Sequence, residues 1–259
     1  MKKVAVIFAG GTGQRMGSDI PKQFMKVQGR EIIIHTLEKF DVNDNIDQIV
    51  VACIEDWIPE LHKLIQRYDI NKVVSVIPGG ATGQDTIYLA LEEVKRVNSN
   101  DKEDPIVLIH DGVRPLITQE TIDKCVDGVV NYGSAITSTA CFETPLLSVD
   151  GETVENMPPR RAVYTAQAPQ CFYLNDILSA HHKVREYNPE YKDIVDSCGL
   201  MYSLGKKCHL IEGNRGNIKV TTPEDYITLL GNLQAEDFRQ FYELEANRKK
   251  KEESISLKK

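Results

Sequence analysis

The sequence predicts an α/β protein with a Rossmann-like, mostly parallel sheet flanked by helices. Short runs rich in Val and Ile lie at 4–8, 48–53, 73–77 and 106–110. Consecutive apolar residues of this kind are typical of strands that are buried on both faces. Helical patterns separate the runs, and the repetition of strand, helix and strand predicts right-handed βαβ units in a parallel sheet.

Helices are expected between and after these strands. They lie at about 31–40, 55–67, 84–96, 175–187 and 193–204. In the segment 84–96 most apolar side chains share one helical face, which favours packing against a sheet. A last strand is expected at 209–213. A last helix is expected to begin at Thr222, where Pro223 and two acidic residues follow a capping hydroxyl.

The pattern changes after residue 134, where apolar and polar residues alternate. Asp150-Gly151 supplies a turn signal within this stretch. The alternation predicts an antiparallel β-arm at about 136–165 that protrudes from the main sheet. Arms of this kind often pair with a second copy of the chain. We therefore expect a single domain over 1–240 that carries this arm, followed by a charged, flexible tail over 245–259.

Composition limits the kind of function. The net charge of -7 argues against generic binding to nucleic acid. The first apolar run, 4–9, is too short for a signal peptide or a membrane span, so we expect a cytoplasmic protein with no membrane partner. The six cysteines form no C-x-x-C pair, which favours reduced thiols over a metal site or disulfides.

The stretch FAGGTGQRMGSDIPKQF (8–24) follows the first predicted strand. Its spacing does not match the G-x-G-x-x-G of a dinucleotide fold, and no Gly-Lys-Ser/Thr follows as in a Walker loop. A tight turn without a ligand would leave the glycines, Arg15 and Lys22 unexplained. In a nucleotidyltransferase loop, backbone N–H groups approach a triphosphate, while Arg15 and Lys22 neutralise the pyrophosphate that leaves.

Five motifs in order make the chain resemble the cytidylyltransferases that produce CDP-linked alditols. They are AGGTGQRMGSDIPKQF, PGGATGQDTIYLAL, IHDGVRP, AQAPQCF and EGNRGNIKVTTPED, and the resemblance covers about residues 3 to 230. The family includes methylerythritol 4-phosphate and ribitol 5-phosphate cytidylyltransferases. The resemblance implies a nucleotidyltransferase fold, a homodimer, CTP and an alditol phosphate as substrates, and Mg²⁺ on the triphosphate.

The same resemblance implies roles for individual residues. Arg15, Lys22 and Lys219 would stabilise the transition state of nucleotidyl transfer. The nucleotide-binding positions would be Ala9, Gly10, Gly11, Gly13, Gly80 and Thr86. The acceptor-binding positions would be Asp111, Arg114, Arg160, Ala168 and Asp196, with Asp111 also a candidate metal ligand. Arg160, on the arm, would reach the acceptor phosphate in a partner subunit.

Three positions depart from the family pattern. Gly83 stands where the family commonly has arginine, and Ala168 and Val195 stand where it often has threonine. Since both threonines belong to the acceptor side, the departures favour a ribitol 5-phosphate-like acceptor over methylerythritol phosphate. An alternative of another class is a non-catalytic nucleotide-binding protein. Three cations around a leaving group argue against it.

Overall fold

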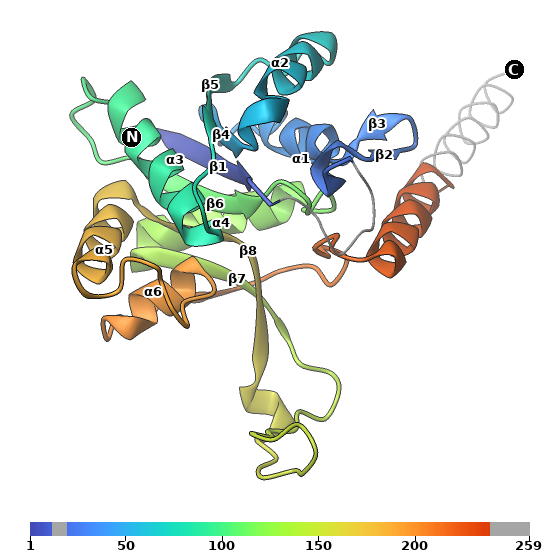
Figure 1. Cartoon of the computed structure of the whole chain (residues 1–259), viewed down its shortest axis with the longest axis vertical. Helices are drawn as coiled ribbons and strands as arrows, with labels where there is room; N and C mark the ends of the chain where they lie inside the picture. Colours follow the sequence, from blue (N-terminus) through green and yellow to red (C-terminus); the bar gives the residue numbers. More distant parts are fainter. Residues whose placement is uncertain (12–19, 239–259) are drawn as a thin grey trace, which may run out of the picture.

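The computed structural model describes residues 1–11 and 20–238. Within these residues, seven strands form one sheet in the order β5-β4-β1-β6-β8-β7-β9, and two short strands form a separate hairpin. Figure 1 shows helices on both faces of the large sheet and an arm that projects away from it. The α/β class, the mostly parallel sheet and the protruding arm are therefore confirmed.

The strands of the large sheet are β1 Lys3–Ala9, β4 Gln48–Cys53, β5 Val73–Pro78, β6 Ile106–Asp111, β7 Ser134–Ala140, β8 Tyr164–Tyr173 and β9 Leu210–Glu212. The first four pair in parallel, as does β7 with β9. β8 runs antiparallel to its neighbours β6 and β7. Each of the four apolar runs in the first half of the chain forms a strand within one residue of its predicted bounds.

The helices are α1 Ile32–Asp41, α2 Ile58–Arg67, α3 Gly83–Val97, α4 Gln119–Tyr132, α5 Leu174–Tyr187 and α6 Ser197–Ser203. Shorter elements are η2 Lys22–Phe24, β2 Lys26–Val27, β3 Arg30–Glu31, η3 Glu55–Trp57 and η4 Arg160–Ala162. Residues 223–238 are also helical. The predicted helices are confirmed, with α6 beginning four residues later than expected.

α4 is not among the predicted helices, although the sequence carries its signals. Thr118 caps its first turn, and Gly133 ends it in the left-handed conformation with φ 78°. Its buried apolar residues recur at helical spacing, at Ile122, Cys125, Val126 and Val129.

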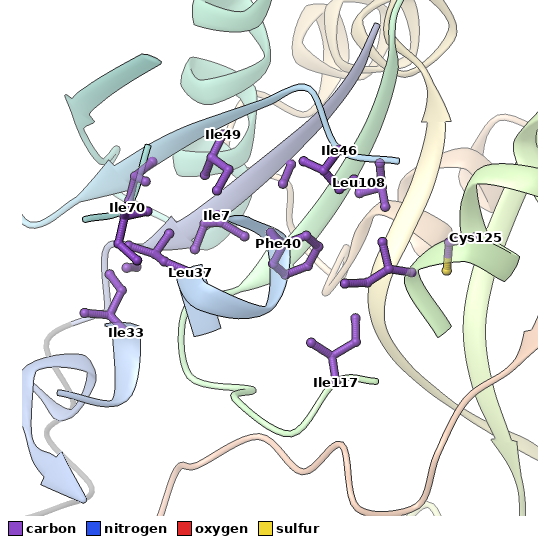
Figure 2. Packing of buried hydrophobic residues seen from close by; sticks show 14 of the residues in the cluster. Ile7, Ile33, Leu37, Phe40, Ile46, Ile49, Ile70, Leu108, Ile117 and Cys125 are labelled. Carbon is purple, nitrogen blue, oxygen red and sulfur yellow. The ribbon is translucent and has the colours of Figure 1, made fainter. Parts of the chain in front are cut away.

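Apolar side chains cover both faces of the sheet. In β1, Ala5 and Ile7 belong to one buried cluster, whereas Val4 and Val6 belong to another on the opposite face. Figure 2 shows the first cluster, in which Leu37 and Phe40 of α1 pack over strand residues that include Ile7. Each fully buried side chain of this size stabilises the fold by about 1.5–3 kcal/mol. The strand ends that face the site are therefore held by a tightly packed core.

The arm is anchored by the β7–β8 pair, which extends to Ala140 opposite Tyr164. Beyond it, 141–163 holds a single isolated bridge, between Leu147 and Asn156, so the arm is less regular than the alternating pattern predicted. Its turn contains Gly151 at φ 75°, as the Asp-Gly signal predicts. Several large apolar side chains on it are exposed, namely Phe142, Leu146, Leu147, Val149, Val154 and Met157.

The sheet order creates a switch point between β1 and β6. β1 pairs in parallel with β4 on one side and with β6 on the other. In open α/β sheets, ligands bind outside the carboxyl ends of strands at such a point. No helix in the described part of the chain is long and apolar enough to cross a membrane.

Candidate active site

A cleft of about 360 Å³ opens at the carboxyl ends of β1 and β6. It brings together eight of the candidate residues, from segments far apart in the sequence: Ala9, Gly10, Gly11, Lys22, Gly80, Thr86, Asp111 and Lys219. Gly13 and Arg15 lie outside the described residues. The nucleotide-binding and catalytic candidates that the structure describes thus meet in one place.

The end of β1 is tied to η2 through Gln23. The buried side-chain amide of Gln23 donates to the carbonyl oxygens of Ala9 at 2.6 Å and of Gly11 at 3.1 Å. Lys22 precedes it and is itself buried at the edge of the cleft. Pro21 sets the backbone before η2 with φ -56°. The glutamine therefore fixes the position of Lys22 relative to the start of the glycine-rich stretch.

Residues 79–86 form the opposite wall of the cleft, which we call the 79–86 loop. The backbone N–H of Gly80 donates to the Thr86 hydroxyl at 3.0 Å, and that hydroxyl donates to the carbonyl oxygen of Thr82 at 2.8 Å. A Cβ at Gly10 would lie 3.0 Å from Thr86 Oγ1, so glycine lets the end of β1 approach the loop closely. Thr86 therefore shapes the loop through the backbone.

Asp111 is the electrostatic centre of the cleft. Its Oδ2 accepts from Arg114 Nε at 2.8 Å, and its Oδ1 lies 2.5 Å from Lys219 Nζ. Burial by itself would raise the pKa of Asp111, but Lys219 and Arg114 outweigh burial and hold that pKa below its ordinary range. The carboxylate is thus charged near neutral pH and holds Lys219 at the cleft.

His110 supports the same turn from inside the core. Its ring is fully buried, and Nε2–H donates to the carbonyl oxygen of Arg114 at 3.1 Å. Burial lowers the pKa of His110 to about 4, so the imidazole is neutral at pH 7. A neutral ring that holds the backbone of the turn has a structural role.

Among the acceptor-side candidates, Asp111 lines the cleft, whereas the others do not. Arg114 donates to the carbonyl oxygen of Asn217 at 2.8 Å, and Asn217 in turn donates to the carbonyl oxygen of Ala168 at 2.7 Å. Asp196 caps α6 by accepting from the N–H of Gly199 at 2.7 Å, and its other oxygen accepts from Gln170 at 2.8 Å. Both oxygens of that carboxylate are therefore used in the fold.

Arg160 lies on the exposed arm, in η4. Its Nη1 donates to the carbonyl oxygen of Phe142 at 3.1 Å. Val195, one of the departures from the family pattern, is 93% exposed. Neither side chain lines the cleft described above.

Three residues that the sequence analysis did not single out also build the site. Thr82 lines the cleft and caps α3, a role that its position before a helical pattern could have suggested. Gln23 and Asn217 act through amide hydrogen bonds to distant backbone carbonyls. No local pattern reveals such contacts, because they depend on which segments the fold brings together.

The residues around Asp111 are a poor match to a protein-built Mg²⁺ site. Both of its oxygens face cationic donors, so a metal ion there would compete with Lys219. Across 1–11 and 20–238, no group of three or more His, Cys, Asp or Glu side chains is placed to hold a metal ion. Any Mg²⁺ would depend mainly on oxygen ligands that the substrate brings.

Comparisons with known proteins give matches that cover most of the chain. Residues 3–230 match the family model described as IspD, 2-C-methyl-D-erythritol 4-phosphate cytidylyltransferase. The chain is 43% identical over 240 residues to ribitol-5-phosphate cytidylyltransferase from Vibrio parahaemolyticus, covering 92% of this chain and 99% of the relative. It is 36% identical over 226 residues to a 2-C-methyl-D-erythritol 4-phosphate cytidylyltransferase from Clostridium botulinum. This match covers 87% of this chain and 95% of the relative.

Solved structures resemble the fold over nearly the whole chain. The structure of 4-diphosphocytidyl-2C-methyl-D-erythritol synthase from Anaerococcus prevotii superposes with a TM-score of 0.77 at 26% identity, covering 90% of this chain and 96% of that chain. The 2-C-methyl-D-erythritol 4-phosphate cytidylyltransferase of Francisella tularensis gives a TM-score of 0.73 at 27% identity, covering 90% and 100%.

Proposed function

Because the chain belongs to the IspD family of cytidylyltransferases, we propose that it transfers CMP from CTP to an alditol phosphate resembling ribitol 5-phosphate. The products are a CDP-alditol and pyrophosphate. The observation that carries the proposal is the single cleft in which the glycine-rich end of β1, the 79–86 loop, Lys22 and Lys219 converge. A nucleotidyl transfer needs this combination of backbone donors and cations.

The reaction is a displacement at the α-phosphorus. An oxygen of the acceptor phosphate forms the new P–O bond, and the bond to the β-phosphate breaks with release of pyrophosphate. The acceptor phosphate is ionised near neutral pH, so no general base is required. Lys22 and Lys219 balance the negative charge that grows on the departing pyrophosphate, with Lys219 kept in place by Asp111. Mg²⁺ bound to the triphosphate of CTP would add to this charge neutralisation.

Ribitol 5-phosphate is preferred as the acceptor on two grounds. The relatives named as ribitol-5-phosphate cytidylyltransferases, from Vibrio parahaemolyticus and Streptococcus agalactiae, are 43% and 39% identical, compared with 36% for those named for methylerythritol phosphate. Ala168 and Val195 also remove two hydroxyls that the family places near its acceptor. The alternative acceptor is 2-C-methyl-D-erythritol 4-phosphate.

The deciding experiment is a pyrophosphate-release assay with CTP, Mg²⁺ and each of several alditol phosphates. We expect kcat/KM for ribitol 5-phosphate to exceed that for 2-C-methyl-D-erythritol 4-phosphate by about tenfold or more. Turnover of the methylerythritol substrate alone would overturn the preferred acceptor. Tight CTP binding without turnover of any alditol phosphate would favour the non-catalytic alternative.

We also propose that the protein is a cytoplasmic homodimer whose arms complete the partner's site. Exposed apolar side chains such as Phe142 and Val149 on the arm support pairing, and Arg160 lies on that arm rather than at the cleft of its own chain. Mixing Arg160→Ala with Lys22→Ala protein tests this. If two chains share each site, re-equilibrated mixtures should recover about a quarter of wild-type activity. No recovery in verified heterodimers would contradict the shared site.

A further inference from the structure

Arg185 of α5 makes an ion pair with the first turn of α3, 100 residues away in the sequence. Its Nη1 donates to Asp85 Oδ1 at 2.8 Å, and its guanidinium lies over the Tyr88 ring, 4.5 Å from the centroid. The side chains are only partly exposed, at 35% for Arg185 and 19% for Asp85. Neither residue lines the cleft, and none of the motifs considered above gives Arg185 a role.

Asp85 lies directly behind the wall of the cleft. A Cβ at Gly80 would fall 2.4 Å from Asp85 Cβ, so the backbone of the loop rests against this side chain. Asp85 Oδ2 accepts from the Thr82 hydroxyl at 2.9 Å, and that hydroxyl accepts from the Asp85 N–H at 3.1 Å. Gly80 and Thr82 both line the cleft. A displacement of Asp85 is therefore transmitted to two cleft residues.

We propose that Arg185 is a positioning residue for the nucleotide, acting through Asp85 on Gly80 and Thr82. The inference rests on the proposed function, in which the 79–86 loop forms one wall of the CTP-binding cleft. The loop presents backbone groups and small side chains, so its shape depends on what supports it from behind. Binding groups must be held within a fraction of an ångström to be effective. Within the described residues, Arg185 is the ion-pair partner of Asp85.

The competing explanation is that the pair only clamps α5 onto α3. In that case removal of Arg185 would lower the melting temperature and leave nucleotide affinity unchanged. The Arg96–Glu93 pair offers a control on α3 itself, with two hydrogen bonds of 2.7 Å and an arginine that is more exposed than Arg185. Arg96→Gln removes the same kind of charge without touching Asp85.

The experiment measures the Kd of CTP by calorimetry, and KM and kcat by pyrophosphate release, for wild type, Arg185→Gln, Arg185→Lys and Arg96→Gln. We expect Arg185→Gln to raise the Kd and KM for CTP about tenfold, with kcat and the KM of the acceptor within about twofold of wild type. Arg185→Lys should recover most of the loss, since one donor reaches Asp85. Arg96→Gln should match wild type.

A double-mutant cycle tests the route through Asp85. If Arg185 acts through that carboxylate, Arg185→Gln combined with Asp85→Asn should weaken CTP binding no more than the worse single change. Unchanged CTP affinity in a folded Arg185→Gln variant, or fully additive effects, would overturn the inference. A shifted CTP Kd without any turnover in wild type would support the inference while overturning the proposed function. Wild-type protein that binds no CTP would overturn both.

Discussion

Gly10, Gly80 and Thr86 meet across one cleft of a single chain, whereas Arg160 and Asp196 on the proposed acceptor side lie outside it. The proposed nucleotide side consists of strand ends and a helix start that the core holds in place. The two acceptor-side candidates contrasted with them are instead an arginine on a projecting arm and an aspartate whose two oxygens are already bonded. The contrast suggests that one chain defines the nucleotide site, while acceptor recognition needs more than the residues that converge in it.

The largest effect on turnover is expected from Lys22→Ala, which removes a cation from the proposed nucleotide side of the cleft. Turnover should fall by about 10³-fold, because charge on the leaving pyrophosphate loses a fixed partner. Steady-state pyrophosphate release measures the loss. Lys63→Ala is the control, since Lys63 is exposed and pairs only with Glu60 among the interactions described. Undiminished turnover in Lys22→Ala would disprove the mechanism proposed for this side of the cleft.

Asp111→Asn tests whether the negative charge of Asp111 stabilises the fold through its ion pairs with Lys219 and Arg114. The change leaves Lys219 and Arg114 without their shared carboxylate, so we expect a loss of about 3 kcal/mol in the free energy of unfolding at pH 7. Urea unfolding measures it.

The pH dependence of this loss has a definite sign. The pKa of Asp111 is lowered in the folded protein, so its contribution to stability is present above the ordinary carboxyl pKa, near 4, and is lost as pH falls through the lowered value. The difference in the free energy of unfolding between wild type and Asp111→Asn should therefore become smaller as the pH falls below about 4. A difference in the free energy of unfolding that stays constant over that pH range would contradict the lowered pKa of Asp111.

Much of the nucleotide side is predictable from sequence because its residues occur in short, ordered motifs. Glycines must follow β1 where backbone and loop come close, and the consecutive apolar residues of β1 and β6 fix where those motifs lie. The acceptor side is not predictable in this way. Whether Asp196 is free to bind a ligand depends on α6 beginning next to it and on Gln170 arriving from β8, and both follow from tertiary packing.

Gly80→Ala and Gly83→Ala form a matched pair on the 79–86 loop. A Cβ at Gly80 would lie 2.4 Å from Asp85 Cβ and 2.9 Å from the Asp85 carbonyl carbon, so the backbone must shift. We expect the KM for CTP to rise about tenfold and the free energy of unfolding to fall by about 2 kcal/mol. At Gly83 a Cβ meets no atom of the described residues within 4 Å, so alanine at this helix start should be neutral or slightly stabilising.

Equal effects of the two alanines on CTP affinity would contradict this account, since the added methyl group is the same. The melting temperature separates a general loss of fold from a local change in the loop. A lower melting temperature with unchanged KM in Gly80→Ala would mean that the loop does not hold the nucleotide as proposed.

The smallest effect on activity is expected from Asp196→Ala, on the proposed acceptor side. The carboxylate caps α6 through Gly199 and accepts from Gln170, so its loss should destabilise the fold by about 1–2 kcal/mol. If these bonds are its whole role, the KM of the alditol phosphate should stay within about twofold of wild type. Asp196→Asn keeps an oxygen for the cap and should recover part of the stability. A tenfold rise in acceptor KM in Asp196→Asn at wild-type melting temperature would instead return Asp196 to the acceptor site.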